Sequence, residues 1–388
     1  MKKILLISFI AFCIQINAQT LLDTMIINFN SNAIENFKLL SNNSKNYTFC
    51  PIAQQISFYQ LYFASKNYTF KSIQNFLNPS KNFDTNVNFA VLLNQTIIQN
   101  NSFNSKFDYS IHIYADTSIK VKKRFNELNK KMLLCDTVRK YPMTEGKSQI
   151  SQFVKNNVFR QSKINLYNYL KPEHIADTPS LILLNAINSE FVLSSQFTSY
   201  YESIFYQTTT GKQFHNVIYS FSNNYFKYNK TFNYQAVIIP LEQNNLSLLI
   251  IMPQNDINLD TIIDKIDFKE IDFLINRSSY LEQIDLSIPT IKTETFENNK
   301  LLKEKIPNIF DKKSDYSNFS KKTSYPNTYI SYIGISFDIN KENAKEEKSK
   351  PLEKNNVKFL EINKPFYFII FDNKKNIILI IGKIFEVK

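Results

Sequence analysis

Two apolar runs near the C-terminus, NKPFYFIIFDN at residues 363–373 and IILIIGKI at residues 377–384, decide the fold that we expect for this 388-residue chain. A polar stretch, residues 372–376, separates the apolar side chains of the two runs. Short apolar runs joined by a few turn-forming polar residues are typical of a β-hairpin. Residues 366–371 and 377–381 are apolar throughout. Several strand-like runs farther upstream are also fully apolar, so we expect those strands to be buried on both faces.

Segments upstream of this hairpin predict a mixture of helices and strands. Helical patterns cover residues 31–40, 53–65 and 148–164. Short apolar runs bounded by proline or polar turns predict strands at residues 180–187, 236–240, 247–253 and 283–288. The chain has 43% hydrophobic residues, no short internal repeat and no linker-like stretch, which favours one large α+β domain.

The stretch from Lys341 to Lys358 differs from the rest of the chain, because charged residues dominate it and it contains Pro351. Burying so many unpaired charges would cost several kcal/mol for each of them, so this stretch cannot be a core element. Exposed loops of this length are uncommon in a compact domain unless they have a function. We therefore expect an exposed functional loop here.

Short motifs along the chain resemble those of the serpin family, and they occur in the family's order. The C-terminal hairpin is similar to the C-terminal signature of serpins. Upstream motifs are FCP at residues 49–51, LLNAI at 183–187, SLLIIMP at 247–253 and DLSIPTIK at 285–292. They resemble the serpin Phe-x-Ser-Pro, Val-Asn-Ala-Ile, Ser-Met-x-Ile-Ile-Leu-Pro and Asp-Leu-Ser-Leu-Pro-x-Phe-Lys elements. Together the motifs span about residues 30–388.

The resemblance implies an α+β fold, with a single serpin-like domain of three mostly antiparallel or mixed β-sheets, about nine helices and an exposed reactive-centre loop. This loop would comprise about residues 341–363. Residues 335–340 would be the strand that leads out of the main sheet, and the chain from Val357 onward would return into another sheet. An inhibitory serpin offers the loop as bait to a serine protease, which becomes trapped as an acyl-enzyme when the cut loop inserts into the main sheet. The chemistry belongs to the protease, so we expect no catalytic residues and no enzymatic activity.

The hinge is the part of the loop that would insert into the sheet. It comprises Lys341, Glu342, Asn343, Ala344, Lys345, Glu346, Glu347, Lys348 and Ser349. An inserted strand buries every second side chain, and in the family these are small. Counting from Asn340, the inward set would be Ala344, Glu346, Lys348 and Lys350, of which only the alanine fits. Shifting the register by one residue brings in Pro351, which lacks the N–H that a central strand needs.

The scissile bond of the loop falls between Lys354 and Asn355 when counted backwards from residues 363–366. Counting forward from the hinge places the scissile bond near Val357. The two counts disagree because the loop is slightly shorter than is usual in inhibitors. A lysine at the cut would imply a trypsin-like protease as the partner. The alternative is that Lys354 is only one of several solvating charges on the loop.

The resemblance also implies a gate through which the loop enters the sheet. Asn185 matches the asparagine that the family has there. The family's serines fall on Cys50 and Ala53, and its histidine has no counterpart between Tyr329 and Asn340. The gate is therefore altered.

Two functional hypotheses remain. The first is a secreted serpin that inhibits serine endopeptidases, based on the motif order and the position of the loop. The second is a non-inhibitory serpin-fold protein that acts as a binding module, carrier or chaperone, based on the charged hinge and the altered gate. An ordinary hydrolase has little support, because the chain contains no Gly-x-Ser-x-Gly and no His-Glu-x-x-His motif.

The first residues predict export. Met1-Lys2-Lys3, an apolar run at residues 4–14 and Ala18 before Gln19 have the three regions of a secretory signal peptide. We expect cleavage after Ala18, a serpin-like domain over residues 19–388 and an extracellular location. The apolar run is too short for a membrane span, which needs about 20 residues. Cys50 and Cys135 would then remain, either as one disulfide or as free thiols.

The formal net charge of +12 favours acidic partners in general. A basic patch comprises Lys120, Lys122, Lys123, Arg124, Lys130 and Lys131. Apolar residues recur between them at helical spacing, which favours an amphipathic helix with a solvated basic face over a polyanion site. We expect a monomer that binds neither nucleic acid nor membrane.

Metal and cofactor sites are not expected. The three histidines are isolated from one another and from the cysteines, and no Cys-x-x-Cys motif occurs. The four glycines are scattered singly, which excludes the glycine-rich loops that bind nucleotide phosphates.

Overall fold

The computed structural model of the chain describes residues 2–41, 46–99, 107–133, 138–193, 199–206, 213–242, 245–277, 281–298, 300–338, 345–346 and 357–387. Within these residues the α-helices are α1 Lys2–Leu40, α2 Pro51–Ala64, α3 Asn67–Leu77, α4 Phe83–Gln99, α5 Lys123–Leu133, α6 Lys147–Ser162, α7 Leu259–Lys265, α8 Phe268–Asp272 and α9 Lys300–Lys305. Shorter helical turns are η1 Pro172–His174, η2 Phe273–Arg277 and η3 Pro307–Ile309. The α+β fold class and the number of helices agree with the prediction.

The strands of the described residues are β1 Tyr47–Phe49, β2 Phe107–Asp116, β3 Val138–Tyr141, β4 Leu181–Val192, β5 Ser199–Tyr206, β6 Gln213–Lys230, β7 Tyr234–Pro240, β8 Leu246–Pro253, β9 Leu281–Pro289, β10 Ile291–Asn298, β11 Pro326–Asp338, β12 Lys345–Glu346, β13 Lys358–Glu361, β14 Phe366–Asp372 and β15 Ile377–Ile384. The four upstream strands predicted from apolar runs correspond to β4, β7, β8 and β9. Strands β4, β7 and β9 extend beyond the predicted bounds into flanking residues, and β8 begins one residue earlier than predicted, at Leu246.

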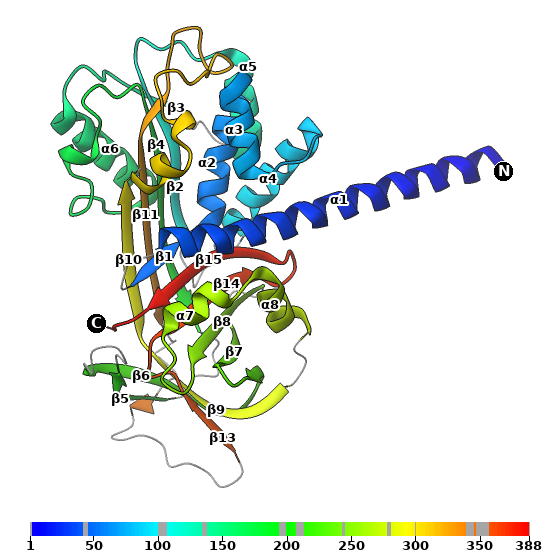
Figure 1. Cartoon of the computed structure of the whole chain (residues 1–388), viewed down its shortest axis with the longest axis vertical. Coiled ribbons are helices and arrows are strands. Elements are labelled where there is room, and N and C mark those ends of the chain that lie inside the picture. Colours follow the sequence, from blue (N-terminus) through cyan, green and yellow to red (C-terminus); the bar gives the residue numbers. More distant parts are fainter. Residues whose placement is uncertain are drawn as a thin grey trace.

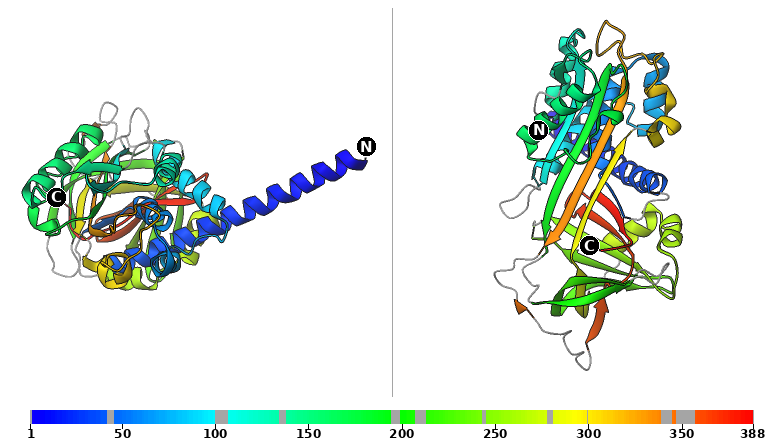
Figure 2. Two further views of the ribbon diagram at one scale, coloured as in Figure 1. Left: turned by 90° about the horizontal axis from the view of Figure 1, so that it is seen from above. Right: turned by 90° about the vertical axis from the view of Figure 1, so that its left-hand side faces the viewer.

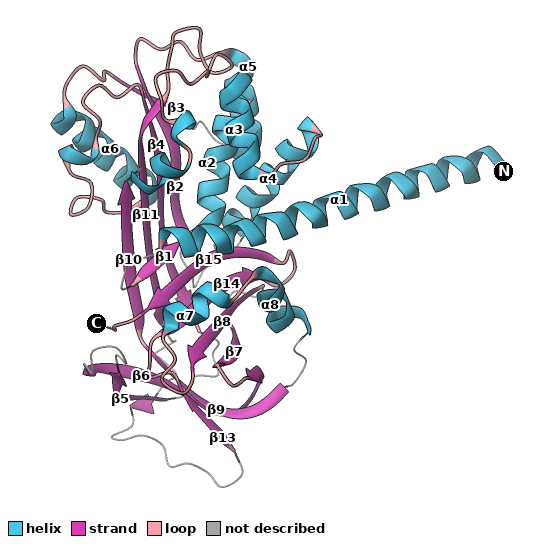
Figure 3. Ribbon diagram, viewed as in Figure 1, coloured by secondary structure: helices cyan, strands magenta, loops and turns pink. Residues whose placement is uncertain are grey.

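The main sheet has five strands in the order β10-β11-β4-β2-β3. It is mixed: β11 and β4 are parallel, as are β2 and β3, whereas β10 and β11 and also β2 and β4 are antiparallel. Its long strands run along the molecule, with helices packed against the sheet (Figures 2 and 3). Residues 181–187 of β4 are all buried, as the apolar run in the sequence predicted.

The second sheet of the described residues follows the path β1-β15-β14-β8-β7-β6-β5-β12, with β9 and β13 joined to its side. The resemblance implies three sheets. In the structure, hydrogen bonds join two of these three into one, so the described residues form two sheets. The long strand β6 makes this connection, because its first part pairs with β5 and its last part pairs with β7. Strand β9 pairs with both parts of β6.

The predicted C-terminal hairpin is confirmed as β14 and β15, which are antiparallel from Phe366 opposite Ile384 to Asp372 opposite Ile377. Strand β14 also pairs with β8, and β15 pairs with β1, so both are interior strands. All residues of both strands are buried, which explains their continuous apolar sequence. At the turn, Asp372 Oδ1 accepts hydrogen bonds from the N–H groups of Lys374 and Lys375, each at 2.9 Å.

Helix α1 is longer than the helix predicted at residues 31–40, and its N-terminal end extends away from the other elements (Figure 1). Met25, Phe29, Ala33 and Phe37 are buried and recur every four residues, so this part of α1 packs against the body of the protein. No helix among the described residues combines the length and apolar character that crossing a membrane requires.

Helix α5 is the amphipathic helix that the basic patch predicted. Phe125 and Met132 are buried, whereas Lys123, Arg124 and Lys131 are exposed. The basic face is therefore in contact with solvent, as expected for a helix that covers the core with its apolar side.

Candidate functional site

The candidate reactive-centre loop leaves the main sheet at the end of β11. The predicted exit strand at residues 335–340 is confirmed as far as Asp338, whose backbone oxygen accepts a hydrogen bond of 2.9 Å from the N–H of Leu193. Most of the predicted hinge and scissile residues lie outside the described residues: Lys341, Glu342, Asn343, Ala344, Glu347, Lys348, Ser349, Lys354 and Asn355.

Two hinge residues are described, and they form the short strand β12. Lys345 and Glu346 pair in parallel with Ser199 and Tyr200 of β5, which belongs to the second sheet. The hydroxyl of Tyr200 donates a hydrogen bond of 3.5 Å to Glu346 Oε2, and Glu346 is exposed to solvent. This part of the hinge therefore lies outside the main sheet, in an environment that suits charged side chains.

The predicted return of the chain into another sheet is confirmed as β13, which pairs in parallel with β9. Lys358 forms an ion pair with Glu282, and its Nζ lies 4.1 Å from the ring centroid of Tyr228. Ser203 Oγ donates a hydrogen bond of 2.9 Å to the carboxylate of Glu361. The backbone N–H of Ile362 donates a hydrogen bond of 2.8 Å to the backbone oxygen of Ser287. The C-terminal end of the loop is thus fixed to the second sheet, near the lower end of the molecule in Figure 1.

Strands β4 and β11 are direct neighbours in the main sheet. They pair from Pro326 opposite Leu181 to Asp338 opposite Val192. No other described strand lies between them. A further strand can enter at this position only if the hydrogen bonds of this parallel ladder break first.

A buried hydrogen-bond chain connects these two strands to helix α2. Ser57 Oγ donates to Asn185 Oδ1 at 2.6 Å, and Asn185 Nδ2 donates to Tyr329 Oη at 3.0 Å. The three residues lie on α2, β4 and β11, and each is at most 3% exposed. Burial is the main cause that raises the pKa of Tyr329, so its hydroxyl stays protonated. We call Ser57, Asn185 and Tyr329 the gate chain.

Only Asn185 of these three residues was predicted from the sequence. The family's serines fall on Cys50 and Ala53, but the serine that contacts Asn185 is Ser57, one helical turn after Ala53. The family's histidine has no counterpart in the sequence, and in the structure Tyr329 of β11 bonds to Asn185. The i to i+4 spacing in α2 would have identified Ser57, since residues so spaced share one helix face.

Cys50 lies beside the gate chain as a free, buried thiol, and burial raises its pKa to about 12. Cys135, the other cysteine expected in the mature chain, lies outside the described residues. A thiol with such a high pKa is a poor nucleophile at neutral pH and acts as a small apolar residue.

A second polar pair, the buried Tyr47 and the half-buried Glu297, lies close to the gate chain. Glu297 of β10 is hydrogen-bonded to the side chain of Tyr47 of β1, and burial raises the pKa of Glu297 to about 7. Burial and the charge of Glu297 both raise the pKa of Tyr47. Glu297 also acts through space on Tyr329, so a carboxyl group that titrates near neutral pH lies close to the candidate gate.

Several solved structures share this fold over nearly their whole length. Maspin is 18% identical with a TM-score of 0.81, covering 95% of this chain and 100% of maspin. Serine protease inhibitor (serpin)-12 of Manduca sexta is 15% identical with a TM-score of 0.78, covering 92% and 98%. Thyroxine-binding globulin in complex with thyroxine is 16% identical with a TM-score of 0.77, covering 94% and 99%. At these identities, the likeness shows the fold alone.

The five-stranded sheet, the buried C-terminal hairpin and the loop between β11 and β13 define a protein of the serpin class. The family model described as "Serpin (serine protease inhibitor)" matches residues 28–387, so the chain belongs to the serpin family. No curated protein sequence matches the chain significantly.

Proposed function

We propose that this protein is a secreted serpin that inhibits serine endopeptidases with the loop at about residues 341–363. One observation carries the proposal: β4 and β11 are directly paired, while the hinge residues Lys345 and Glu346 lie on the edge of the second sheet. This is the arrangement that an inhibitor needs before it meets a protease, because the position for a further strand is still closed. The Manduca sexta relative is named a serine protease inhibitor.

In the proposed mechanism the protease supplies all of the catalytic groups. Its serine attacks the carbonyl carbon of the scissile bond, proposed at Lys354-Asn355, and the new amino terminus leaves while an ester forms. The freed hinge would then insert between β4 and β11. Insertion replaces one parallel ladder by two new ladders, so the gain in backbone hydrogen bonds drives the movement.

The alternative is a non-inhibitory serpin that binds or carries a ligand. The sequence of the hinge favours this alternative, because Glu346, Lys348 and Lys350 would all point inward after insertion and an unpaired buried charge costs several kcal/mol. A relative of the same fold, thyroxine-binding globulin, is seen in complex with thyroxine. The fold is therefore compatible with either function.

The deciding experiment is incubation of the mature chain with trypsin and with elastase, followed by denaturing gel electrophoresis. Inhibition predicts a band that contains protease and serpin joined by an ester. The variant Lys354→Ala should lose this band with trypsin if the scissile bond is assigned correctly. Cleavage within the loop without any covalent complex, together with an unchanged melting temperature of the cleaved protein, would favour the alternative instead.

Export requires that residues 1–18 can be removed without damage to the fold. Thr20 and Leu21 are exposed, and the first buried side chain described in α1 is that of Met25. Cleavage after Ala18 therefore keeps every buried side chain described in α1 in the mature chain, which supports the proposed signal peptide. Mass spectrometry of the protein from the culture medium of an exporting host should give a mature chain that begins at Gln19.

A further inference from the structure

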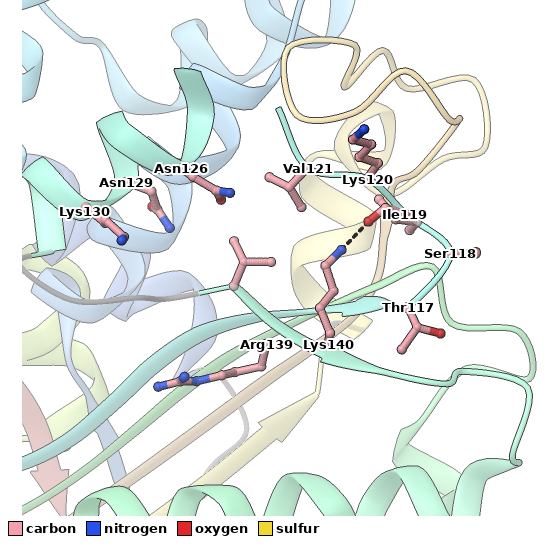
Figure 4. A pocket seen from close by; sticks show the side chains of 11 residues that line it. Thr117, Ser118, Ile119, Lys120, Val121, Asn126, Asn129, Lys130, Arg139 and Lys140 are labelled. Carbon is pink, nitrogen blue, oxygen red and sulfur yellow. Dashed lines mark hydrogen bonds between the residues drawn. The ribbon is translucent and has the colours of Figure 1, made fainter. Parts of the chain in front are cut away.

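Two pockets of the molecule differ in the charge of their walls. One, of about 610 Å³, lies between α5, β3 and the turn after β2 (Figure 4). Its cations do not converge, because Lys140 points to the backbone oxygen of Ile119 and Arg139 points away from it (Figure 4). The described lining of the other pocket, of about 330 Å³, has one cation, Lys163, and one anion, Glu294. Its formal charges cancel, so a neutral ligand suits this second pocket.

Four segments of the chain build the second pocket. The stretch after α6 contributes Lys163, Ile164, Asn165, Asn168 and Tyr169, β4 contributes Asn188, β10 contributes Glu294, and β11 contributes Tyr332. Every one of these side chains except that of Ile164 carries a polar or charged group. The pocket therefore offers many hydrogen bonds and little purely apolar surface, which does not suit a hydrophobic ligand.

A carboxylate held by two tyrosines forms one wall of the pocket. Tyr332 Oη donates a hydrogen bond of 3.0 Å to Glu294 Oε1, and the hydroxyl of Tyr169 donates to Oε2 of the same carboxylate. The centroids of the two tyrosine rings are 5.0 Å apart. Burial and the nearby Glu294 raise the pKa of both phenols, so both hydroxyls stay protonated. Carboxylate and phenol oxygens have further lone pairs, which can accept hydrogen bonds from a ligand.

Two asparagine side chains add donors to this wall of acceptors. The side-chain amides of Asn168 and Asn188 make no hydrogen bond within the described part of the chain. Asn188 is half-buried, and polar groups at such positions normally have a hydrogen-bond partner. Each amide offers two N–H donors and one carbonyl acceptor. The pocket thus combines donors and acceptors that are not used by the protein itself.

The pocket extends across the ladder between β4 and β11. Asn188 of β4 lies directly opposite Gly334 of β11. A Cβ atom at Gly334 would lie 2.6 Å from Asn188 Oδ1 and 2.9 Å from Tyr332 Oη, so the glycine leaves space for both groups. An amide from one strand and a hydroxyl from the other are therefore neighbours at the position where a further strand would enter. We call this pocket the seam pocket.

We propose that the seam pocket binds a small neutral saccharide, which contacts β4 and β11 at the same time. The hydroxyl groups of a saccharide both donate and accept hydrogen bonds, which matches the mixture of amides, phenols and carboxylate in the pocket. The volume lies at the lower end of the range of about 300–1,000 Å³ that small-ligand sites have, and it suits one or two sugar rings.

A saccharide bound in this way would oppose insertion of the loop. A strand placed between β4 and β11 moves Asn188 away from Tyr332 by about 4.8 Å, the spacing of neighbouring strands. The saccharide then binds the closed sheet more tightly than the opened one and shifts the equilibrium toward the closed sheet. This consequence rests on the proposed inhibitory function, whereas binding itself does not.

The test is a saturation-transfer NMR titration of the intact protein with three probes, D-glucose, N-acetyl-D-glucosamine and maltose. The pocket variant Asn168→Ala/Asn188→Ala removes both amides. Its matched control, Asn75→Ala/Asn126→Ala, removes two exposed amides from α3 and α5, outside the pocket. We expect saturable binding of at least one probe, with a dissociation constant of about 1 mM or lower. The affinity should fall about fivefold or more in the pocket variant and less than about twofold in the control.

Absence of saturable binding for all three probes overturns the proposal, and so does an equal affinity of the pocket and control variants. Thermal unfolding without ligand checks that both variants are folded. If the pocket variant does not fold, Gly334→Ala replaces it, because the new methyl group displaces the Asn188 amide. An unchanged affinity of Gly334→Ala would overturn the proposal.

Repeating the titration after cleavage of the loop separates the site from the proposed function. A cleaved protein that melts at a higher temperature than the intact one has inserted its loop, and its affinity for the probe should be at least about tenfold lower. An unchanged affinity in such a sample would overturn the placement of the saccharide across β4 and β11. If cleavage changes neither the melting temperature nor the affinity, the inhibitory function fails while the saccharide site stands.

Discussion

Asn185 of β4 donates a hydrogen bond of 3.0 Å to the phenol oxygen of Tyr329 on the neighbouring strand β11. This bond crosses the ladder between the two strands that a further strand would have to separate. Ser57 of α2 bonds to the other end of the same amide at 2.6 Å. Opening of the sheet at this point therefore breaks a buried side-chain bond in addition to backbone bonds, which makes the closed sheet more stable.

Removal of the Tyr329 hydroxyl should destabilise the protein. In Tyr329→Phe the Asn185 amide keeps its bond from Ser57 but loses its acceptor, and an unsatisfied buried donor costs about 1–3 kcal/mol. The free energy of unfolding in urea should fall by that amount. Tyr325→Phe is the matched control, because Tyr325 is half-buried and its hydroxyl makes no described hydrogen bond, so its change should stay within about 0.5 kcal/mol. If both variants lower the free energy of unfolding equally, the hydrogen bond to Asn185 contributes nothing to stability.

The sequence was most informative where burial is complete. The runs at residues 366–371 and 377–381 are apolar throughout, because β14 and β15 are interior strands, and this pattern identified the hairpin directly. The helical pattern predicted only residues 31–40 of α1 Lys2–Leu40, because the continuous apolar run at residues 4–14 has no polar face and was interpreted as part of a signal peptide.

The gate chain was predicted only at Asn185. Its other two members, Ser57 and Tyr329, are far from Asn185 in sequence and are joined to it by the packing of α2 on β4 and of β4 beside β11. A family motif predicts which position carries a given residue. The same hydrogen bond can, however, be made by a side chain one helical turn away or by a different type of residue.

Gly382 of β15 has no room for a side chain. A Cβ atom at this position would lie 2.2 Å from Cζ of Phe368 and 3.0 Å from the backbone oxygen of Tyr47. Phe368 is completely buried, so its ring cannot move aside without disturbing the core. Gly382→Ala should therefore lower the free energy of unfolding by about 1–3 kcal/mol through overpacking.

The same contact predicts coupling between the two positions. Phe368→Leu removes the atoms that the new methyl group would meet, so Gly382→Ala should cost less in the Phe368→Leu background than in the wild-type protein. A double-mutant cycle measured by urea unfolding gives this difference, which should be at least about 0.5 kcal/mol. Strict additivity of the two changes would contradict the steric explanation.

Glu297 should make the stability of the protein depend on pH near neutrality. Burial raises its pKa to about 7 in the folded state, compared with about 4.3 in an unfolded chain. The folded state therefore binds the proton more tightly. The contribution of the Glu297 carboxyl group to the free energy of unfolding is fully present below about pH 4.3 and is lost as the pH rises through about 7. The total change is on the order of 3 kcal/mol.

The variant Glu297→Gln isolates this effect, because an amide keeps the size and the hydrogen-bond acceptor of the carboxyl group but does not ionise. Its free energy of unfolding should be close to that of the wild-type protein at pH 4.5 and should exceed it by about 2–3 kcal/mol at pH 8. Urea unfolding over this pH range measures the difference between the two proteins. A difference that stays constant with pH would show that Glu297 does not titrate as the structure implies.

The charges of the hinge should limit insertion of the loop into the main sheet, if the proposed inhibitory mechanism is correct. In the register counted from Asn340, the triple variant Glu346→Ala/Lys348→Thr/Lys350→Ala removes every inward charge. Each such charge would cost several kcal/mol in the inserted strand. Cleavage of the loop should raise the melting temperature of the triple variant above that of its intact form. This rise should be larger, by about 10 °C or more, than the rise found for the wild-type protein.

The matched control changes the residues that alternate with this set, Lys345→Ala/Glu347→Ala, whose side chains would lie on the opposite face of the inserted strand. Differential scanning calorimetry of cleaved and intact samples compares the two variants, and the control should widen the gap less than the triple variant does. A larger effect of the control would mean that the hinge inserts in the other register, in which Pro351 falls on the inward face. If neither variant increases the difference in melting temperature between cleaved and intact protein, charge is not what prevents insertion. The loop of this serpin would then act as a binding surface and not as a strand that inserts into the sheet.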